Sequence, residues 1–367
     1  MAIEKINIEN FLSLADHHPV IDVRSPGEYK HAHLPGAYSL PLFTDEERAT
    51  VGTAYKQESR EKAIKIGLDF FGPKMKRMVE EVEDLMLKVE HSTFNSKTIL
   101  IYCWRGGMRS SAVAWLLDLY GFRVYTLIGG YKKFRNYVLD SFKPSYSFKI
   151  LGGYTGSGKT EVLKELKRKG EAVIDLEKIA NHKGSAFGNI GMPAQPTQEM
   201  FENLLSYELR AVNCEQKGNT NSPLTIDNLP VWLEDESQRI GLINIPTDFW
   251  NSMRRSPVYF LEIPFEERLK HLVEEYGILD KQNMIDAVGR IRERLGGLEA
   301  KNVIRFLEED NLSESFRILL KYYDKWYTKA LHNREGLNSL LHRITCESVT
   351  PGNAKKIIQE PVHQEEH

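Results

Sequence analysis

Cysteine is scarce in this 367-residue sequence, with only Cys103, Cys214 and Cys346 present. An odd, sparse set excludes a disulfide framework and a cysteine zinc cluster. Long apolar runs are also lacking, since none reaches the ~18 residues of a membrane span, and we expect no membrane partner. Acidic residues interrupt the apolar positions at the start of the chain, which is not typical of a secretory signal. We therefore expect a cytoplasmic protein with reduced thiols.

A large excess of one charge is absent as well. Lys and Arg total 49 and Asp and Glu total 51, giving a formal net charge of −2. This balance excludes a wholly basic nucleic-acid binder, so any RNA site must be a local patch. A content of 41% hydrophobic and 27% charged residues is typical of a globular chain and excludes wholesale disorder. The length indicates roughly two domains.

The first part of the chain alternates apolar runs with helix-like stretches. Residues 19–24, 98–102 and 124–127 are predicted strands, and the charged stretch 44–67 is a predicted helical region. Residues 113–120 place apolar side chains at i, i+3, i+4 and i+7, which predicts another helix. Alternating strands and helices predict a parallel sheet covered on both faces. We assign residues 1–140 to this first α/β domain.

The second part begins after a linker-like stretch at residues 140–146. A strand to residue 151, a glycine loop and a helix over 160–169 follow, and residues 172–175 and 230–234 are predicted as later strands. From residue 265 onward the composition is typical of helices. We expect residues 141–367 to form an α/β domain with a helical C-terminal part.

Residues 153–160 read Gly-Tyr-Thr-Gly-Ser-Gly-Lys-Thr and fit the phosphate-loop pattern G-x-x-x-x-G-K-[ST] in full. A predicted strand precedes this loop and a predicted helix follows it, so backbone N–H groups and the helix N-terminus would face an anion. The pattern predicts binding of a di- or triphosphate, and a glycine-rich turn without a ligand is the alternative. The predicted phosphate-binding residues are Gly153, Thr155, Gly156, Ser157, Gly158, Lys159 and Thr160.

A phosphate loop of this kind predicts Mg²⁺, with the Thr160 hydroxyl among its ligands. An acidic ligand should come from the end of a later strand. Residues 231–236 offer Glu234, Asp235 and Glu236, and Asp227 is a weaker rival. An acidic helix start is the alternative interpretation of these carboxylates. We favour Glu234 or Asp235, with Thr160 and Glu234 as the predicted metal ligands.

The loop after the predicted strand 98–102 reads Cys-Trp-Arg-Gly-Gly-Met-Arg-Ser, from Cys103 to residue 110. Backbone N–H groups at the start of the following helix would point at the sulfur, and Arg105 and Arg109 lie close by in the sequence. This environment favours the thiolate and predicts a nucleophile, whereas a buried cysteine elsewhere is usually inert. Cys103, Arg105 and Arg109 are the predicted catalytic residues.

The Cys103 loop, together with residues 21–24, Glu28 and the His-Leu-Pro-Gly-Ala run at 33–37, resembles a rhodanese domain. In that family the loop cysteine carries a persulfide or an analogous perselenide. Arg109 stands six residues after the cysteine, one more than in the common rhodanese loop. The longer loop resembles those of rhodanese relatives that hold phosphate-sized groups, which favours a phosphate-bearing chalcogen donor over thiosulfate.

The order of the two parts, with further stretches at 45–56, 176–188, 195–198, 234–237 and 294–297, resembles the tRNA 2-selenouridine synthase family. The resemblance implies a tRNA partner, contacted at its anticodon region, whose wobble 2-thiouridine becomes 2-selenouridine. Geranyl diphosphate first alkylates the sulfur, and selenium from selenophosphate then replaces the S-geranyl group. Cys103 would carry selenium while Arg105 and Arg109 hold the phosphate. The phosphate loop and Mg²⁺ would stabilise the departing pyrophosphate.

Further residues have a functional and a structural interpretation side by side. His182 and Lys183 are predicted to contact the substrate with Glu234 and Asp235, although a solvated loop would also explain the first two. The geranyl tail could be lined by residues that are equally well explained as core: Phe187, Ile190, Met192 and Trp232. Lysines interleaved with aromatics at 321–327 could stack RNA bases or pack against a neighbouring element.

Two other functions remain open. The chain could be an ATP-dependent tRNA sulfurtransferase or kinase with a rhodanese sulfur-carrier domain, which would require nucleotide turnover. It could also be an inactive rhodanese domain joined to a nucleotide-sensing domain. Cys103 with Arg105 and Arg109 argues against this last function, because an adaptor has no need of an activated thiol.

Overall fold

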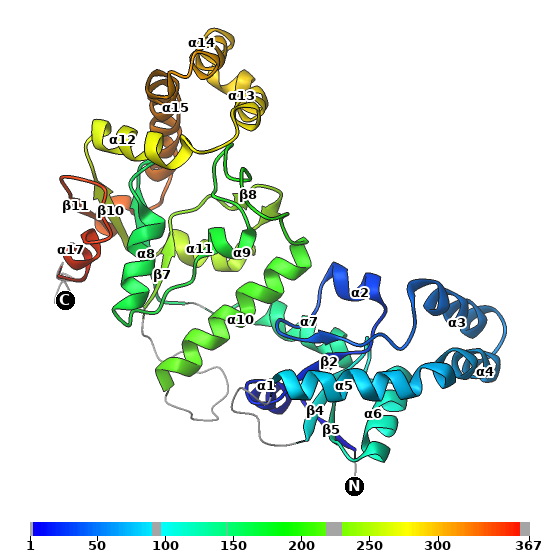
Figure 1. Ribbon diagram of the computed structural model, residues 1–367. Helices are drawn as coiled ribbons and strands as arrows, with labels where there is room; N and C mark the ends of the chain where they lie inside the picture. The colour runs from blue at the N-terminus through cyan, green and yellow to red at the C-terminus, as the bar shows by residue number, and fades with distance from the viewer. Residues whose placement is uncertain (1–2, 90–96, 145, 218–229, 360–367) are drawn as a thin grey trace. The chain divides into compact units, whose positions relative to one another are not determined.

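The computed structural model describes the chain except for residues 1–2, 90–96, 145, 218–229 and 360–367. Contacts divide it into two units (Figure 1). The first comprises the described residues up to Ser141 and the segment Glu202–Tyr207, and the second comprises the rest. Each unit has its own sheet and core and is described by itself.

The first unit is built on a five-stranded parallel sheet in the order β1-β5-β4-β2-β3. Every residue of the central β4 is buried, as expected for a strand covered on both faces. The predicted parallel sheet is thereby confirmed. Its strands are β1 (Glu4–Ile6), β2 (Val20–Asp22), β3 (Tyr38–Ser39), β4 (Thr98–Tyr102) and β5 (Arg123–Leu127). Its helices are α1 (Ile8–Ala15), α2 (Pro26–His31), α3 (Asp45–Gln57), α4 (Arg60–Phe71), the 3₁₀ turn η1 (Gly72–Lys74), α5 (Met75–Val89), α6 (Met108–Tyr120) and α7 (Gly130–Asp140).

The charged stretch predicted as helical forms two helices, α3 and α4. Ser59 separates them because its side chain accepts a hydrogen bond from the Lys62 N–H (3.1 Å), which caps the start of α4. Later in the chain, Gly121 ends α6 in the left-handed conformation (φ 106°), as glycine after a helix commonly does. α6 follows the Cys103 loop directly, so its N-terminus faces that loop.

The second unit is built on a four-stranded parallel sheet in the order β11-β10-β6-β7, of which Figure 1 labels β7, β10 and β11. Its strands are β6 (Phe148–Gly153), β7 (Val231–Glu234), β10 (Val258–Glu262) and β11 (Leu341–Thr345), with a separate antiparallel pair β8 (Arg239–Ile240) and β9 (Ile243–Asn244). Its helices are α8 (Lys159–Arg168), α9 (Leu176–Ala180), α11 (Thr247–Arg254), α12 (Phe265–Tyr276), α13 (Lys281–Leu295), α14 (Gly297–Glu308), α15 (Leu312–His332), α16 (Leu337–Leu340) and α17 (Asn353–Gln359). α10 (Gln198–Lys217) also belongs to it, apart from the segment Glu202–Tyr207.

Two local predictions for the second unit were wrong. The stretch predicted as helical from residue 265 contains the edge strand β11, which pairs with β10 along its whole length. Only Ile344 of β11 is fully buried, so the strand lacks the apolar pattern of an interior strand. Residues 172–175 do not form a strand, since only Val173 makes an isolated bridge to Trp232 of β7.

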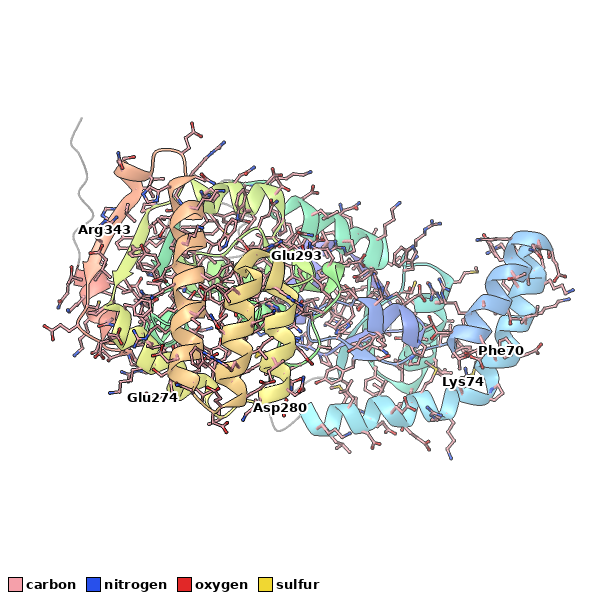
Figure 2. All side chains as sticks on the ribbon, turned by 90° about the horizontal axis from the view of Figure 1, so that it is seen from above. Phe70, Lys74, Glu274, Asp280, Glu293 and Arg343 are labelled. Atoms are coloured by element: carbon pink, nitrogen blue, oxygen red, sulfur yellow. The ribbon has the colours of Figure 1, made fainter. Side chains whose placement is uncertain are left out.

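The helical C-terminal part is confirmed and has a core of its own. α13, α14 and α15 pack in sequence, and Figure 2 shows them side by side, with Asp280 and Glu293 marking α13. The Asp280 side chain caps α13 by accepting a hydrogen bond from the Asn283 N–H (2.8 Å). The buried side chains include Leu272, Met284, Val303, Phe316 and Leu320. α12 packs against α15, and both helices carry residues to the site described next.

Candidate active site

The phosphate loop joins the end of β6 to the start of α8, where the N–H groups of the first helical turn have no helical partners. β6 lies between β10 and β7, so the loop emerges from the middle of the sheet at its carboxyl edge. The Lys159 ammonium donates a hydrogen bond to the Gly153 carbonyl (3.2 Å). This is the strand–loop–helix setting in which the pattern binds phosphate groups.

The glycines of the loop allow a close approach by α12. Gly156 has a φ of +79°, and a Cβ at this position would lie 2.8 Å from Leu272 Cγ and 2.9 Å from the Arg268 carbonyl oxygen. Arg268 donates to the Thr155 carbonyl (3.1 Å) and forms a bidentate ion pair with Asp324 of α15 (2.9 and 2.8 Å). α12 and α15 therefore hold the outer side of the phosphate loop.

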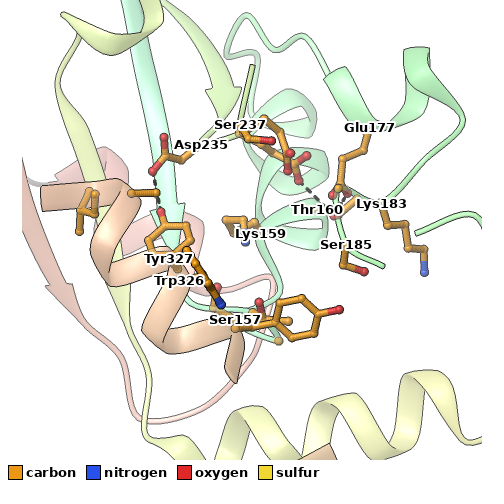
Figure 3. Close-up of a pocket in the computed structure, with 18 of the residues that line it drawn as sticks. Ser157, Lys159, Thr160, Glu177, Lys183, Ser185, Asp235, Ser237, Trp326 and Tyr327 are labelled. Carbon is orange, nitrogen blue, oxygen red and sulfur yellow. Dashed lines mark hydrogen bonds between the residues drawn. The ribbon is translucent and has the colours of Figure 1, made fainter. Parts of the chain in front are cut away.

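A buried hydrogen-bonded chain braces the start of the loop. The Tyr327 hydroxyl accepts from the Gly153 N–H (3.2 Å) and donates to Asp235 (2.6 Å), which also forms an ion pair with Arg334 (2.6 Å). Figure 3 shows Asp235 turned toward Tyr327. Burial and the Asp235 charge raise the pKa of Tyr327 well above its usual value, so it remains a donor. Asp235 is thus a bracing residue, and its carboxylate points away from Thr160.

Three carboxylates meet beside Thr160: Glu177 from α9, Glu234 at the end of β7, and Glu236 two residues later. We call them the acidic trio, since one oxygen of each lies within 4.8 Å of the others. Thr160 donates its hydroxyl proton to Glu234 Oε1 (3.1 Å; Figure 3), whereas the buried Glu234 Oε2 has no hydrogen-bond partner among the described residues. Hard oxygen donors and an orphaned buried oxygen fit a magnesium ion.

Without a cation, the three carboxylates of the acidic trio repel one another in a buried place, which disfavours their charged forms. Burial and the nearby charge of Glu236 raise the pKa of Glu177 to about 8. Burial and the charge of Glu234 raise the pKa of Glu236 to about 8 as well. Glu234 is almost fully buried, and its pKa is raised well above the ordinary range by burial and the Glu177 charge. Near neutral pH the trio therefore holds protons that a divalent cation would displace.

The phosphate loop and the acidic trio open into a cavity of about 710 Å³. Its walls come from the loop, the α9–α10 connection, α11, α12 and α15. Lys183 lies on this wall and pairs with Glu275 (2.6 Å). In Figure 3, Lys183 and Ser185 lie on one side of Lys159, and Trp326 and Tyr327 lie on the other. The cavity thus combines an anion cradle, a cation site and an aromatic wall.

A second candidate site belongs to the first unit, at the loop between β4 and α6. Cys103 is buried, and its sulfur receives a hydrogen bond from the Gly107 N–H (3.3 Å) and lies 3.2 Å from the Ser110 hydroxyl. The close packing of Gly130 keeps this loop in place, since a Cβ there would lie 2.2 Å from the Cys103 carbonyl oxygen. The Gly107 N–H therefore points at the sulfur from the start of α6.

The two arginines of the Cys103 loop lie in different environments. Arg109 forms an ion pair with Glu28 (2.7 Å), which also pairs with Arg48 (2.9 Å). Burial raises the pKa of Glu28, but the hydrogen bond and charge of Arg109 outweigh it, so this pKa lies below its usual value. Arg105 is exposed and has no ion pair within the described part of the chain. Arg105 is therefore free to meet an anion, whereas Arg109 is held by Glu28.

Comparison with known proteins covers both units. Residues 146–350 match the family model described as the tRNA 2-selenouridine synthase AAA domain, and residues 8–137 match the rhodanese-like domain. A tRNA 2-selenouridine synthase from Hydrogenovibrio crunogenus is 35% identical over 86% of this chain and 90% of its own length. One from Bdellovibrio bacteriovorus is 33% identical over 86% of this chain and 89% of its own. This chain belongs to the tRNA 2-selenouridine synthase family.

A solved structure also resembles the chain. It is the N-terminal domain of a protein from Clostridium difficile 630 that is named as ATP/GTP-binding, and it is 40% identical to this chain. The match covers 38% of this chain and 99% of that domain, with a TM-score of 0.34.

No helix among the described residues of this tRNA 2-selenouridine synthase family member is long and apolar enough to cross a membrane.

Of the four residues predicted from the sequence to contact the substrate, three line the cavity and one does not. Glu234 and Lys183 line the cavity, as does Asp235 next to its bracing partners. His182 is outside the set of cavity-lining residues: its ring is buried, its Nδ1 has no hydrogen-bond partner among the described residues, and burial lowers its pKa. Asp227, the rival metal ligand, lies outside the described residues.

The residues suggested for a geranyl tail occupy other places. Phe187 and Ile190 belong to the helical core, and Trp232 of β7 is packed against Tyr259 in the core of the parallel sheet. Among the described residues that line the cavity, neither these three residues nor Met192 is found. Some residues that the sequence did not predict as catalytic, substrate-binding or metal-binding belong to the two sites: Glu28 to the Cys103 loop, and Glu177, Arg268 and Arg334 to the phosphate-loop site. Glu177 lies in the stretch 176–188, which resembles the tRNA 2-selenouridine synthase family. This resemblance was the signal in the sequence that could have pointed to Glu177.

The raised pKa of Glu236 predicts an effect on stability. Its pKa rises from 4.5 toward about 8 on folding, so the folded chain binds more protons than the unfolded chain between these values, and stability falls as pH rises through this window. Glu236→Gln is therefore expected to stabilise the metal-free protein by roughly 2 kcal/mol more at pH 8 than at pH 4.5. Denaturant unfolding in the presence of a chelator measures this difference.

Glu161→Gln is the matched control, because Glu161 lines the same cavity outside the acidic trio. It should leave the pH dependence of unfolding unchanged. Equal stabilities of Glu236→Gln and wild type at pH 8 would contradict the claim that the charged form of Glu236 destabilises the metal-free protein. Addition of Mg²⁺ should stabilise the wild type more than the variant.

Proposed function

We propose that this protein converts 2-thiouridine at the wobble position of tRNA to 2-selenouridine through an S-geranylated intermediate. The observation that carries the proposal is the pairing, in one family member, of a rhodanese-type cysteine loop with a phosphate-loop cavity that has an apolar wall. Geranyl diphosphate and selenophosphate are the co-substrates, and the tRNA is contacted at its anticodon region. The relatives' shared name supports the overall reaction.

The first step is alkylation at the phosphate-loop cavity. The thiocarbonyl sulfur forms a bond to C1 of the geranyl group, the C1–O bond to diphosphate breaks, and the base loses its N3 proton. The loop N–H groups and Lys159 receive the negative charge that develops on the departing diphosphate. Thr160 and the acidic trio would hold Mg²⁺, which supplies additional charge neutralisation for the diphosphate.

The second step is selenium transfer at Cys103. An S-alkyl group on C2 leaves as a thiol, whereas a thiocarbonyl sulfur is a poor leaving group. Selenium from selenophosphate replaces it, with Cys103 as the selenium carrier. The Cys103 thiolate forms an S–Se bond as the Se–P bond breaks and phosphite leaves, and the terminal selenium then forms the C2–Se bond as the C2–S bond breaks and geranyl thiol departs. A second thiol, acting as the two-electron reductant, cleaves the S–Se bond and forms a disulfide with Cys103. The exposed guanidinium of Arg105 is suited to the phosphate part, and Arg109 joins it only by leaving Glu28.

Mass spectrometry of a 2-thiouridine anticodon stem-loop tests the proposal. The RNA is incubated with the protein and geranyl diphosphate, and then with selenophosphate. We expect the mass of one geranyl group to appear first and to be replaced by that of selenium in place of sulfur. Absence of the geranylated species under conditions that yield 2-selenouridine would refute the two-step scheme.

A phosphate loop equally suits ATP, so the second candidate is an ATP-dependent tRNA sulfurtransferase or kinase with a rhodanese sulfur carrier. ATP hydrolysis stimulated by tRNA, with no use of geranyl diphosphate, would favour this candidate over the first.

A further inference from the structure

One face of α15 forms a wall of the phosphate-loop cavity. Five of its residues line the cavity at the spacing i, i+3, i+4, i+7 and i+8: Tyr323, Trp326, Tyr327, Ala330 and Leu331. We call this set the α15 wall. It extends roughly 12 Å along the helix, from Tyr323 to Leu331. Leu272 of α12 and Trp250 of α11 line the same cavity.

The α15 wall begins at the phosphate loop itself. Tyr327 binds the Gly153 N–H through its hydroxyl, and the Tyr154 ring lies 5.7 Å from the Tyr327 ring. Leu272 approaches the loop at Gly156 from the other side. When a diphosphate is bound in the phosphate loop, the organic group attached to it would therefore lie against the α15 wall.

The two tyrosine hydroxyls of the wall are already used by the protein. The Tyr323 hydroxyl accepts from the Ala186 N–H (3.3 Å), and the Tyr327 hydroxyl bonds Gly153 and Asp235. What the wall offers to the cavity is carbon surface, chiefly the indole of Trp326, which is 43% exposed. A large exposed aromatic side chain beside a phosphate cradle is typical of a binding surface for an apolar ligand.

We propose that the α15 wall, with Trp326 as its principal contact, binds the hydrocarbon tail of a prenyl diphosphate whose diphosphate lies in the phosphate loop. This inference rests on the proposed function for the identity of the prenyl group, and it moves the tail from the core residues suggested by the sequence to α15. A prenyl chain needs apolar surface and no hydrogen bonds, and the carbon surface of the wall supplies this.

Calorimetric titration with geranyl diphosphate, dimethylallyl diphosphate and inorganic pyrophosphate tests the inference. The wild type should bind the geranyl compound most tightly and pyrophosphate least tightly. Trp326→Ala should weaken geranyl diphosphate by about tenfold, the loss expected for about 1.4 kcal/mol of apolar contact, and pyrophosphate by less than about twofold. Trp326→Phe should retain most of the affinity, since a ring remains.

Lys325→Ala is the matched control, because Lys325 is exposed on the same turn of α15 and is not a cavity-lining residue. It should bind all three ligands like the wild type. Since Trp326 is 43% exposed and lies outside the buried core, Trp326→Ala should unfold at nearly the wild-type temperature. The wild-type preference for geranyl over dimethylallyl, if kept in Trp326→Ala, would overturn the inference.

ATP serves as the competing probe. If ATP displaces geranyl diphosphate and loses affinity in Trp326→Ala by the same factor, the wall stacks a base and the inference fails. The proposed function can fail separately: a wild type that binds prenyl diphosphates through Trp326 but alkylates no 2-thiouridine RNA would refute the function and leave the binding surface standing.

Discussion

Replacing Cys103 by Ala is expected to stop the incorporation of selenium while S-geranylation of 2-thiouridine continues. The thiol is the group that would carry selenium, and its sulfur lies at the N-terminus of α6, with the Gly107 N–H directed at it (3.3 Å). No other described cysteine belongs to this loop. Loss of a covalent nucleophile should lower selenium transfer by at least ~100-fold.

The measurement separates the two steps in one sample. A 2-thiouridine stem-loop given geranyl diphosphate and selenophosphate should accumulate the S-geranyl species with the Cys103→Ala variant, and proceed to 2-selenouridine with the wild type. Cys346→Ala is the control, because it removes a thiol from an equally buried position in the second unit. It should support both steps. Survival of both steps in Cys103→Ala would show that Cys103 is not the carrier.

Local sequence was sufficient for the two loops. The phosphate loop and the Cys103 loop are continuous stretches in which residue type, spacing and the flanking strand and helix all agree, and the parallel sheets follow from the same alternation. The resemblance to a known family added their combination. Neither conclusion required knowledge of which distant residues meet.

The partners of these loops depend on tertiary contacts that sequence spacing does not report. Glu177 and Glu234 stand far apart in the chain and meet only because α9 and the end of β7 lie at the same edge of the sheet. Arg109 and Glu28 are separated by 81 positions. The choice between Glu234 and Asp235 depended on the direction of each side chain, since Asp235 turns to Tyr327 and leaves Glu234 beside Thr160.

Composition also left the role of α15 open. Its lysines and aromatics are compatible with a nucleic-acid surface, a packed helix or a ligand wall. The contacts favour the ligand wall that we propose: Tyr323 and Tyr327 are tied to backbone N–H groups of the site, whereas Trp326 remains exposed in the cavity. The edge strand β11 was missed for a related reason, because an edge strand buries few side chains and its sequence resembles that of the helices around it.

Replacing Lys159 by Met is expected to abolish S-geranylation while leaving selenium transfer to an RNA that already carries the S-geranyl group. Lys159 is the only lysine of the phosphate loop, and a charge aimed at the departing diphosphate contributes on the order of 10²–10³ to the rate. Met keeps the length and the apolar stem of the side chain, so the variant should fold normally. Alkylation with geranyl diphosphate should fall by at least ~100-fold.

The decisive comparison uses two substrates and a matched lysine. Lys164→Met alters an exposed lysine on the same helix, α8, and should alkylate RNA at the wild-type rate. With pre-geranylated RNA and selenophosphate, Lys159→Met should form 2-selenouridine within about twofold of the wild type, because the Cys103 loop lies in the other unit. Loss of both steps would mean that one site performs them. Unimpaired alkylation would instead remove the phosphate loop from the geranyl step, since no uncharged side chain at position 159 could receive the diphosphate charge.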